Sequence, residues 1–168
     1  VNLPLIKHVA KKNKPIIIST GMSKISEIDD AIETVRSTGN RNLAVLHCNS
    51  SYPSTHSEVN LKFMNNLKSL YNIPVGFSDH TTDLLASKSA ICLGADIIER
   101  HFTLSKRMEG PDHILSSDQK EIADLVKFKK FYKKIDVWFK KREKREKEQI
   151  KLILGDGVKK IQPNEYIT

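Results

Sequence analysis

Cysteines and long hydrophobic runs are scarce in this sequence, and their scarcity argues against several protein classes. The 168 residues include two cysteines, Cys48 and Cys92, too few for a disulfide framework and in keeping with a reducing, cytoplasmic environment. No apolar run approaches the roughly 18 residues that a transmembrane helix needs, and no signal-peptide pattern opens the chain. The sequence therefore predicts neither a disulfide-stabilised secreted domain nor a membrane protein.

A basic surface is also missing from most of the chain, although the net charge is +8. Residues 127–151 contain twelve Lys or Arg and four Asp or Glu, an excess that equals the whole net charge. We interpret this segment as an amphipathic helix that packs an aromatic stripe on a core and keeps its lysines in water. The alternative is a helix that binds nucleic acid or an acidic surface, but no base-reading motif accompanies the lysines. The stripe recurs at helical spacing and consists of Phe128, Phe131, Tyr132, Ile135 and Phe139.

Apolar and amphipathic segments alternate along the rest of the chain. Apolar runs predict strands at residues 16–20, 43–47, 73–77 and 95–102, and helical patterns are found at residues 3–10, 23–38, 59–71, 82–93 and 117–147. Near-continuous apolar strands are typical of a parallel sheet that is buried on both faces. The repeat has the spacing of a (β/α)₈ TIM barrel. The sequence thus predicts an α/β protein, either a small open sheet or half of a barrel.

Polar side chains gather where each predicted strand ends. In parallel α/β folds the carboxyl ends of the strands form the active face, so Ser19 is expected near the polar residues of the later strands. Alternation along a strand places Ser78 on one face with His80, and Glu99 on one face with His101. The same alternation assigns four apolar residues to the inner face of a barrel, namely Ile17, Val45, Val75 and Ile97.

His80 and His101 are a candidate metal site. Neutral imidazoles are common metal ligands, and two of them leave coordination positions open for water and substrate oxygens. From spacing alone, the alternative is a pair of histidines that cap strand ends through hydrogen bonds. His47 is interpreted as a hydrogen-bonded, half-buried histidine, and Cys48 as a small buried residue. Asp112, in the loop after the last predicted strand, is a candidate for the active face or a turn residue.

An ordered set of motifs makes the chain similar to a known family. The motifs are Lys14-Pro15-Ile16-Ile17-Ile18-Ser19-Thr20-Gly21-Met22, His47-Cys48 with Ser51-Tyr52-Pro53, Gly76-Phe77-Ser78-Asp79-His80-Thr81, Ile98-Glu99-Arg100-His101-Phe102-Thr103 and Gly110-Pro111-Asp112-His113. Together they resemble the sialic acid synthases, which include related synthases of bacterial nine-carbon sugar acids and of spore-coat polysaccharide. The resemblance covers residues 3–126.

This resemblance implies a fold and a reaction. Residues 1–150 would hold the last four βα units of a TIM barrel, and residues 151–168 would begin a linker toward a C-terminal antifreeze-like domain. The implied enzyme condenses phosphoenolpyruvate with an N-acetylated amino sugar, such as N-acetylmannosamine, to a nine-carbon sugar acid and releases phosphate. It would be a cytoplasmic homodimer that uses Mn²⁺ or Mg²⁺.

The same resemblance implies residue roles. His80 and His101 match the metal ligands. Ser19 and Ser78 match residues that hold the phosphate of phosphoenolpyruvate. Two further positions match the surroundings of the sugar, Tyr52 and Asp112, and Asp112 is the catalytic candidate.

The chain also departs from the family. It lacks the first half of the barrel, with an essential glutamate and phosphate-binding lysines, so we expect a fragment that is inactive alone. Ser50 stands where some members carry asparagine, which leaves the sugar open. Two alternatives remain, another metal-dependent TIM-barrel lyase and a binding module built on the basic helix.

Overall fold

A computed structural model describes residues 1–154, and in the last helix it describes side chains up to Val137 and at Lys140, Lys141 and Lys144. The helices are α1 (Leu3–Ala10), α2 (Ile25–Ser37), α3 (Phe63–Tyr71), α4 (Leu85–Cys92) and α5 (Gln119–Leu154). The strands are β1 (Ile16–Ser19), β2 (Leu43–Cys48), β3 (Val75–Asp79) and β4 (Ile98–Arg100). The chain divides into two compact units, Val1–Lys129 and Lys130–Thr168. Among the described residues, no helix has the length and apolarity needed to cross a membrane.

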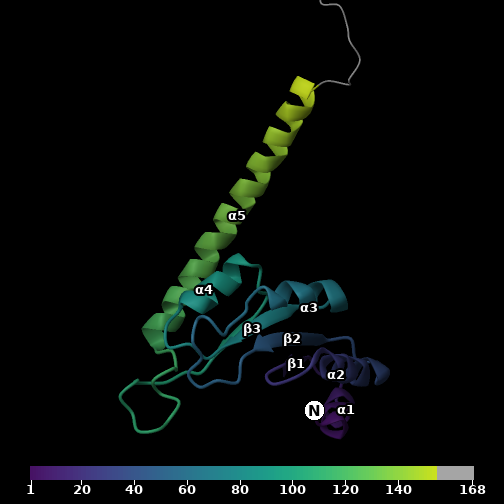
Figure 1. The fold of residues 1–168 in the computed structure, drawn as a ribbon, viewed down its shortest axis with the longest axis vertical. Coiled ribbons are helices and arrows are strands. Elements are labelled where there is room, and N and C mark those ends of the chain that lie inside the picture. Colours follow the sequence, from purple (N-terminus) through teal and green to yellow (C-terminus); the bar gives the residue numbers. More distant parts are fainter. Residues whose placement is uncertain (155–168) are drawn as a thin grey trace, which may run out of the picture. The chain divides into compact units, whose positions relative to one another are not determined.

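The first unit is built on a four-stranded parallel sheet in the order β1–β2–β3–β4. Figure 1 labels β1, β2 and β3 of this sheet. Each strand is connected to the next through a helix, which confirms the predicted α/β class. β4 is shorter than its predicted run, because its ladder with β3 extends only from Ile98 to Arg100. All strands run in one direction, so their carboxyl ends lie at one edge of the sheet.

One face of the sheet packs on the helices and forms the core. Val45, Val75 and Phe77 are completely buried there. The helices contribute most of the opposing side chains of this core, which include Ile28, Ile32, Val35, Met64, Leu67, Ala86 and Ala90. Burying a side chain of this size stabilises the fold by about 1.5–3 kcal/mol relative to leaving it in water.

The register corrects the assignment of the inner-face residues. Val45 pairs with Ile18 and with Val75, whereas Ile17 pairs with Ala44, so Val45 and Val75 lie on the opposite face from Ile17. Their predicted place beside Ile17 is therefore wrong, because counting alternation within each strand does not fix the offset between strands. Ile17 is 54% exposed on the face that no described helix covers.

The helix starts follow local hydrogen bonding. Asn2 caps α1 by accepting from the backbone N–H of Leu5 at 3.1 Å. α2 begins after Lys24, whose N–H donates to the Glu27 carboxylate at 2.7 Å, so the helix starts later than the predicted residue 23. α3 begins later than predicted because Asn60, with a φ of 38°, turns the chain out of a helical path.

The aromatic stripe of α5 packs only in part. In the first unit Phe128 is half-buried, with the Lys88 ammonium 5.6 Å from its ring centroid. In the second unit Phe131 is 62% exposed, and Tyr132 and Ile135 are half-buried. The side chain of Phe139 and the predicted linker residues 155–168 lie outside the described part of the chain.

Candidate active site at the strand ends

Two serines and a carboxylate meet on the uncovered face of the sheet. Ser78 of β3 is in register with Glu99 of β4, and its hydroxyl donates to Glu99 Oε1 at 2.7 Å. Ser19, at the end of β1, donates to the same oxygen at 3.4 Å. The predicted gathering of these side chains is confirmed. Glu99, to which the sequence assigned no role, is the common acceptor.

His80 and His101 follow β3 and β4 and lie next to each other. Their ring centroids are 5.2 Å apart and their planes are nearly perpendicular. His80 Nδ1 lies 2.8 Å from the backbone oxygen of Asn49. Because a carbonyl oxygen only accepts, Nδ1 carries the proton in this hydrogen bond, which leaves the Nε2 lone pair of a neutral ring available to a ligand.

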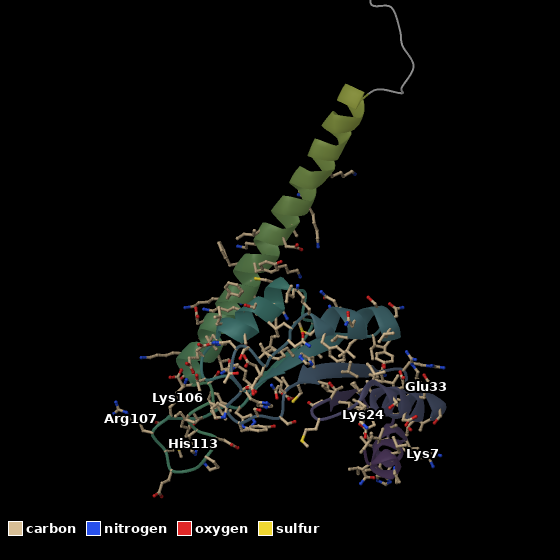
Figure 2. All side chains as sticks on the ribbon, in the orientation of Figure 1. Lys7, Lys24, Glu33, Lys106, Arg107 and His113 are labelled. Carbon is tan, nitrogen blue, oxygen red and sulfur yellow. The ribbon has the colours of Figure 1, made fainter. Side chains whose placement is uncertain are left out.

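The second histidine has a similar partner. His101 Nδ1 lies 3.5 Å from Asp112 Oδ2, which brings the loop after β4 to the cluster. Figure 2 labels Lys106, Arg107 and His113 on this loop. An oxygen acceptor behind the distal nitrogen is the usual support of a metal-binding imidazole.

Tyr52 lies against both imidazoles. Its ring centroid is 4.1 Å from that of His80 and 5.8 Å from that of His101. Desolvation, followed by the charges of Cys48, Asp112 and Glu99, raises the pKa of the phenol. The hydroxyl therefore stays protonated at neutral pH and can donate a hydrogen bond to a bound molecule. The structure thus brings together the predicted site residues Ser19, Tyr52, Ser78, His80, His101 and Asp112 in one region.

His47 and Cys48 lie beside the cluster. His47 Nε2 is 2.7 Å from the backbone oxygen of Val59, and its ring packs against Phe63 and Phe77. Desolvation lowers the pKa of His47, so the ring is neutral. Its hydrogen bond is as predicted, but the residue is more deeply buried than predicted, at 9% exposed. Cys48 is half-buried and burial raises the pKa of its thiol, which makes it a poor nucleophile at neutral pH.

Two hollows lie near the strand ends. One, with a volume of about 350 Å³, includes Ser19 and Gly21 but is lined mainly by apolar residues of the helix-packed face, among them Ile18, Ile28 and Val45. The other, of about 420 Å³, lies at the end of β2 and includes Cys48 and Asn49. The polar lining of the second hollow lies next to the cluster, and its size suits a small molecule rather than a macromolecule.

Two imidazoles, those of His80 and His101, are candidate ligands for a metal ion in this cluster. Within the described residues, no three His, Cys, Asp or Glu side chains are grouped to hold a metal. The pair His80 and His101 nevertheless fits a divalent cation, because each ring has its Nδ1 beside an oxygen and its Nε2 without one. Such a site would take its remaining ligands from water or substrate oxygens.

Residues 1–137 match the NeuB family. The chain belongs to this family. A family match over most of the chain confirms the resemblance drawn from the motifs.

Some of the similar proteins have names that state an activity, and the activity stated is that of a synthase. The chain is 41% identical over 166 residues to N,N'-diacetyllegionaminic acid synthase of Campylobacter jejuni, with 98% of this chain and 44% of that protein covered. It is 53% identical over 123 residues to an uncharacterized protein of Methanocaldococcus jannaschii, and this match covers 73% of this chain and 36% of that protein. The crystal structure of the N-acetylneuraminic acid synthetase of Leptospira borgpetersenii, in complex with citrate, matches with a TM-score of 0.74 and 32% identity. This match covers 98% of this chain and 51% of that chain. The chain thus spans about half the length of these family members, or less.

Proposed function

We propose that this chain supplies the last four βα units of a (β/α)₈ barrel that condenses phosphoenolpyruvate with an N-acetylated amino sugar. The observation that carries the proposal is the convergence of Glu99, its two serines and the His80–His101 pair at the carboxyl edge of a parallel sheet. Active sites of (β/α)₈ enzymes lie at this edge. Kinship with named nine-carbon acid synthases supports the reaction class.

The serine side of the cluster suits the phosphate of phosphoenolpyruvate. Ser19 and Ser78 offer hydroxyl donors, but both now donate to Glu99. Binding of phosphate therefore requires the hydroxyls to turn from the carboxylate to the phosphate oxygens. Two hydroxyls do not neutralise a phosphate dianion, so cationic groups from another part of the barrel complete this subsite.

The histidine side of the cluster suits the sugar. Tyr52 donates from a protonated phenol, and the carboxylate of Asp112, the catalytic candidate, accepts from sugar hydroxyls. His80 and His101 would hold Mn²⁺ or Mg²⁺, which when bound would make the open-chain aldehyde carbon electrophilic. The protein groups orient this carbon toward the enol carbon of phosphoenolpyruvate, whose double bond supplies the electron pair of the new carbon–carbon bond. The aldehyde oxygen takes up a proton, and water adds at the carbon that bears the phosphate, so that inorganic phosphate leaves.

The proposal extends to the whole protein. A cytoplasmic homodimer whose antifreeze-like domain closes the site follows from the family resemblance. The chain alone is expected to be inactive, since the described sheet has four strands and its edge strands β1 and β4 each have one neighbour. The same cluster on a metal-dependent lyase would turn over a sugar without phosphoenolpyruvate.

Binding of Mn²⁺ tests the metal part directly. Titration of the chain with Mn²⁺, followed by the loss of the free-ion EPR signal, should show one site. His80→Ala and His101→Ala should each weaken this site at least tenfold, whereas His8→Ala, an exposed position on α1, should not. Unchanged binding in both strand-end variants would exclude the ligand assignment.

A further inference from the structure

A buried ion pair lies directly behind the candidate site. Asp79 of β3 and Arg100 of β4 are register partners, and the Arg100 Nη1 group donates to Asp79 Oδ2. Their side chains are 0% and 1% exposed. The register directs both side chains toward the helices, on the opposite face of the sheet from Ser78 and Glu99.

Arg100 uses its whole guanidinium fork. Nε donates to Ser117 Oγ at 2.6 Å, and Nη2 donates to the backbone oxygens of Thr81 and Leu115 at 2.8 and 3.2 Å. One side chain thereby joins the end of β3, its own strand β4 and the segment that leads into α5. Only arginine offers this many donors in a fixed plane.

Both carboxylate oxygens of Asp79 accept hydrogen bonds. Oδ1 accepts from the backbone N–H and the hydroxyl of Thr81, at 2.8 Å each. Oδ2 accepts from Ser87 of α4 as well as from Arg100. No buried side-chain nitrogen or oxygen in the described part of the chain lacks a partner, so this network is fully satisfied.

The pair is placed to fix the spacing of the site. Asp79 lies between Ser78 and His80, so its position determines where His80 leaves the sheet. Arg100 lies in the same way between Glu99 and His101. Holding the two buried side chains together therefore sets the distance between the two imidazoles on the other face.

The Arg100 guanidinium also fixes the base of the loop that carries Asp112. Ser117, which accepts from Arg100, donates its backbone N–H to the oxygen of His101 at 2.8 Å. Thr103 in turn donates its N–H to the oxygen of Ser117 at 3.0 Å, which closes the base of the loop. Asp112 reaches His101 from this closed loop.

We propose that Arg100 is a positioning residue, which through Asp79 and Ser117 holds His80, His101 and Asp112 at the spacing that the site requires. This inference rests on the proposed function, because the spacing matters for catalysis only if His80, His101 and Asp112 form the proposed site. Stability alone does not call for an ion pair, because apolar side chains of similar volume often serve a buried position as well.

Arg100→Lys is the informative substitution. It keeps the charge opposite Asp79 but removes the fork, because one ammonium does not reach Ser117, Thr81 and Leu115 together. Mn²⁺ affinity should fall at least tenfold. The NOE between the ring protons of His80 and His101, measured with labelled histidine and without metal, should weaken or vanish.

Arg36→Lys is the matched control. Arg36 also bridges two groups, Glu33 Oε1 and the backbone oxygen of Tyr71, both at 2.9 Å, but it lies on α2 away from the cluster. This variant should keep the Mn²⁺ affinity and the NOE of the unmodified chain. Equal losses in the two variants would overturn the inference.

A second variant separates positioning from folding. The double substitution Asp79→Leu with Arg100→Met replaces the pair by apolar side chains and should leave a folded chain. If this folded variant keeps both the NOE and the Mn²⁺ affinity, the pair is structural and the inference is wrong. If the unmodified chain binds no Mn²⁺, the metal proposal fails, but the NOE still decides whether Arg100 sets the imidazole spacing.

Discussion

Gly76 of β3 is the position at which one added methyl group should disturb both the sheet and the site. A Cβ atom there would lie 2.4 Å from the backbone oxygen of Ile97 and 2.8 Å from its Cβ, so the strands must separate by about 1 Å to restore ordinary contact. Overpacking of this kind costs about 1–3 kcal/mol. Weakening the hydrogen bond from Phe77 N–H to the Ile97 oxygen, now 2.9 Å, adds about 1 kcal/mol.

Gly76→Ala should therefore lower the free energy of unfolding by about 3 kcal/mol, which corresponds to a fall in Tm of about 6–12 °C for a chain of this size. The displacement falls between β3 and β4, so it also moves Glu99 away from Ser78 and His101 away from His80. Urea unfolding monitored by circular dichroism, together with Mn²⁺ titration, measures both effects.

Gly39→Ala is the control for this experiment. Gly39 has a φ of +83° but nothing within 4 Å of an added Cβ, so alanine there meets backbone strain without a clash. We expect a cost of about 1–2 kcal/mol and no change in Mn²⁺ binding. If Gly76→Ala lowers the free energy of unfolding no more than Gly39→Ala, β3 and β4 do not approach each other as closely at Gly76 as the structure shows.

Three further predictions follow from the structure. Because desolvation lowers the pKa of His47, the unfolded chain binds more protons in acid, and the stability contributed by neutral His47 is present above about pH 6.5 and declines below it. Urea unfolding at pH 7.5 and 5.5 should show this decline in the unmodified chain and less of it in His47→Gln; the same decline in both would contradict the assignment. The lysine-rich helix should leave the fluorescence anisotropy of labelled DNA and RNA unchanged at low salt, whereas binding that weakens steeply with salt would support the nucleic-acid alternative. The chain alone, given phosphoenolpyruvate, N-acetylmannosamine and Mn²⁺, should release no phosphate, and turnover would show that the catalytic groups are complete without the rest of the barrel.

Much of the fold is predictable because its signals are local. The apolar run that ends at Ser19 and the polar motifs around His80 and His101 each follow from composition within a few residues. The rule that parallel strands end at one edge then suffices to gather the serines and histidines.

The remaining features depend on contacts between strands. The placement of Val45 and Val75 on the core face and the pairing of Asp79 with Arg100 follow from the register, which no single strand encodes. The role of Glu99 as acceptor from Ser78 has the same origin. Alternation identifies which residues share a face within a strand, but not which face of the sheet that is.

Loop geometry accounts for other differences. The late start of α3 depends on the left-handed backbone of Asn60, a conformation that asparagine tolerates but does not require.

We propose that His80 and His101 belong to the catalytic edge of a phosphoenolpyruvate-dependent synthase, and a chimera tests this assignment most directly. The Campylobacter jejuni synthase aligns with 98% of this chain, so its corresponding segment can be replaced by this sequence. We predict that the chimera releases phosphate from phosphoenolpyruvate only when the sugar substrate of that synthase is also present. His80→Ala and His101→Ala in the chimera should abolish this release, and His8→Ala should not. A folded chimera that releases no phosphate, or one that stays fully active without both histidines, would contradict the account.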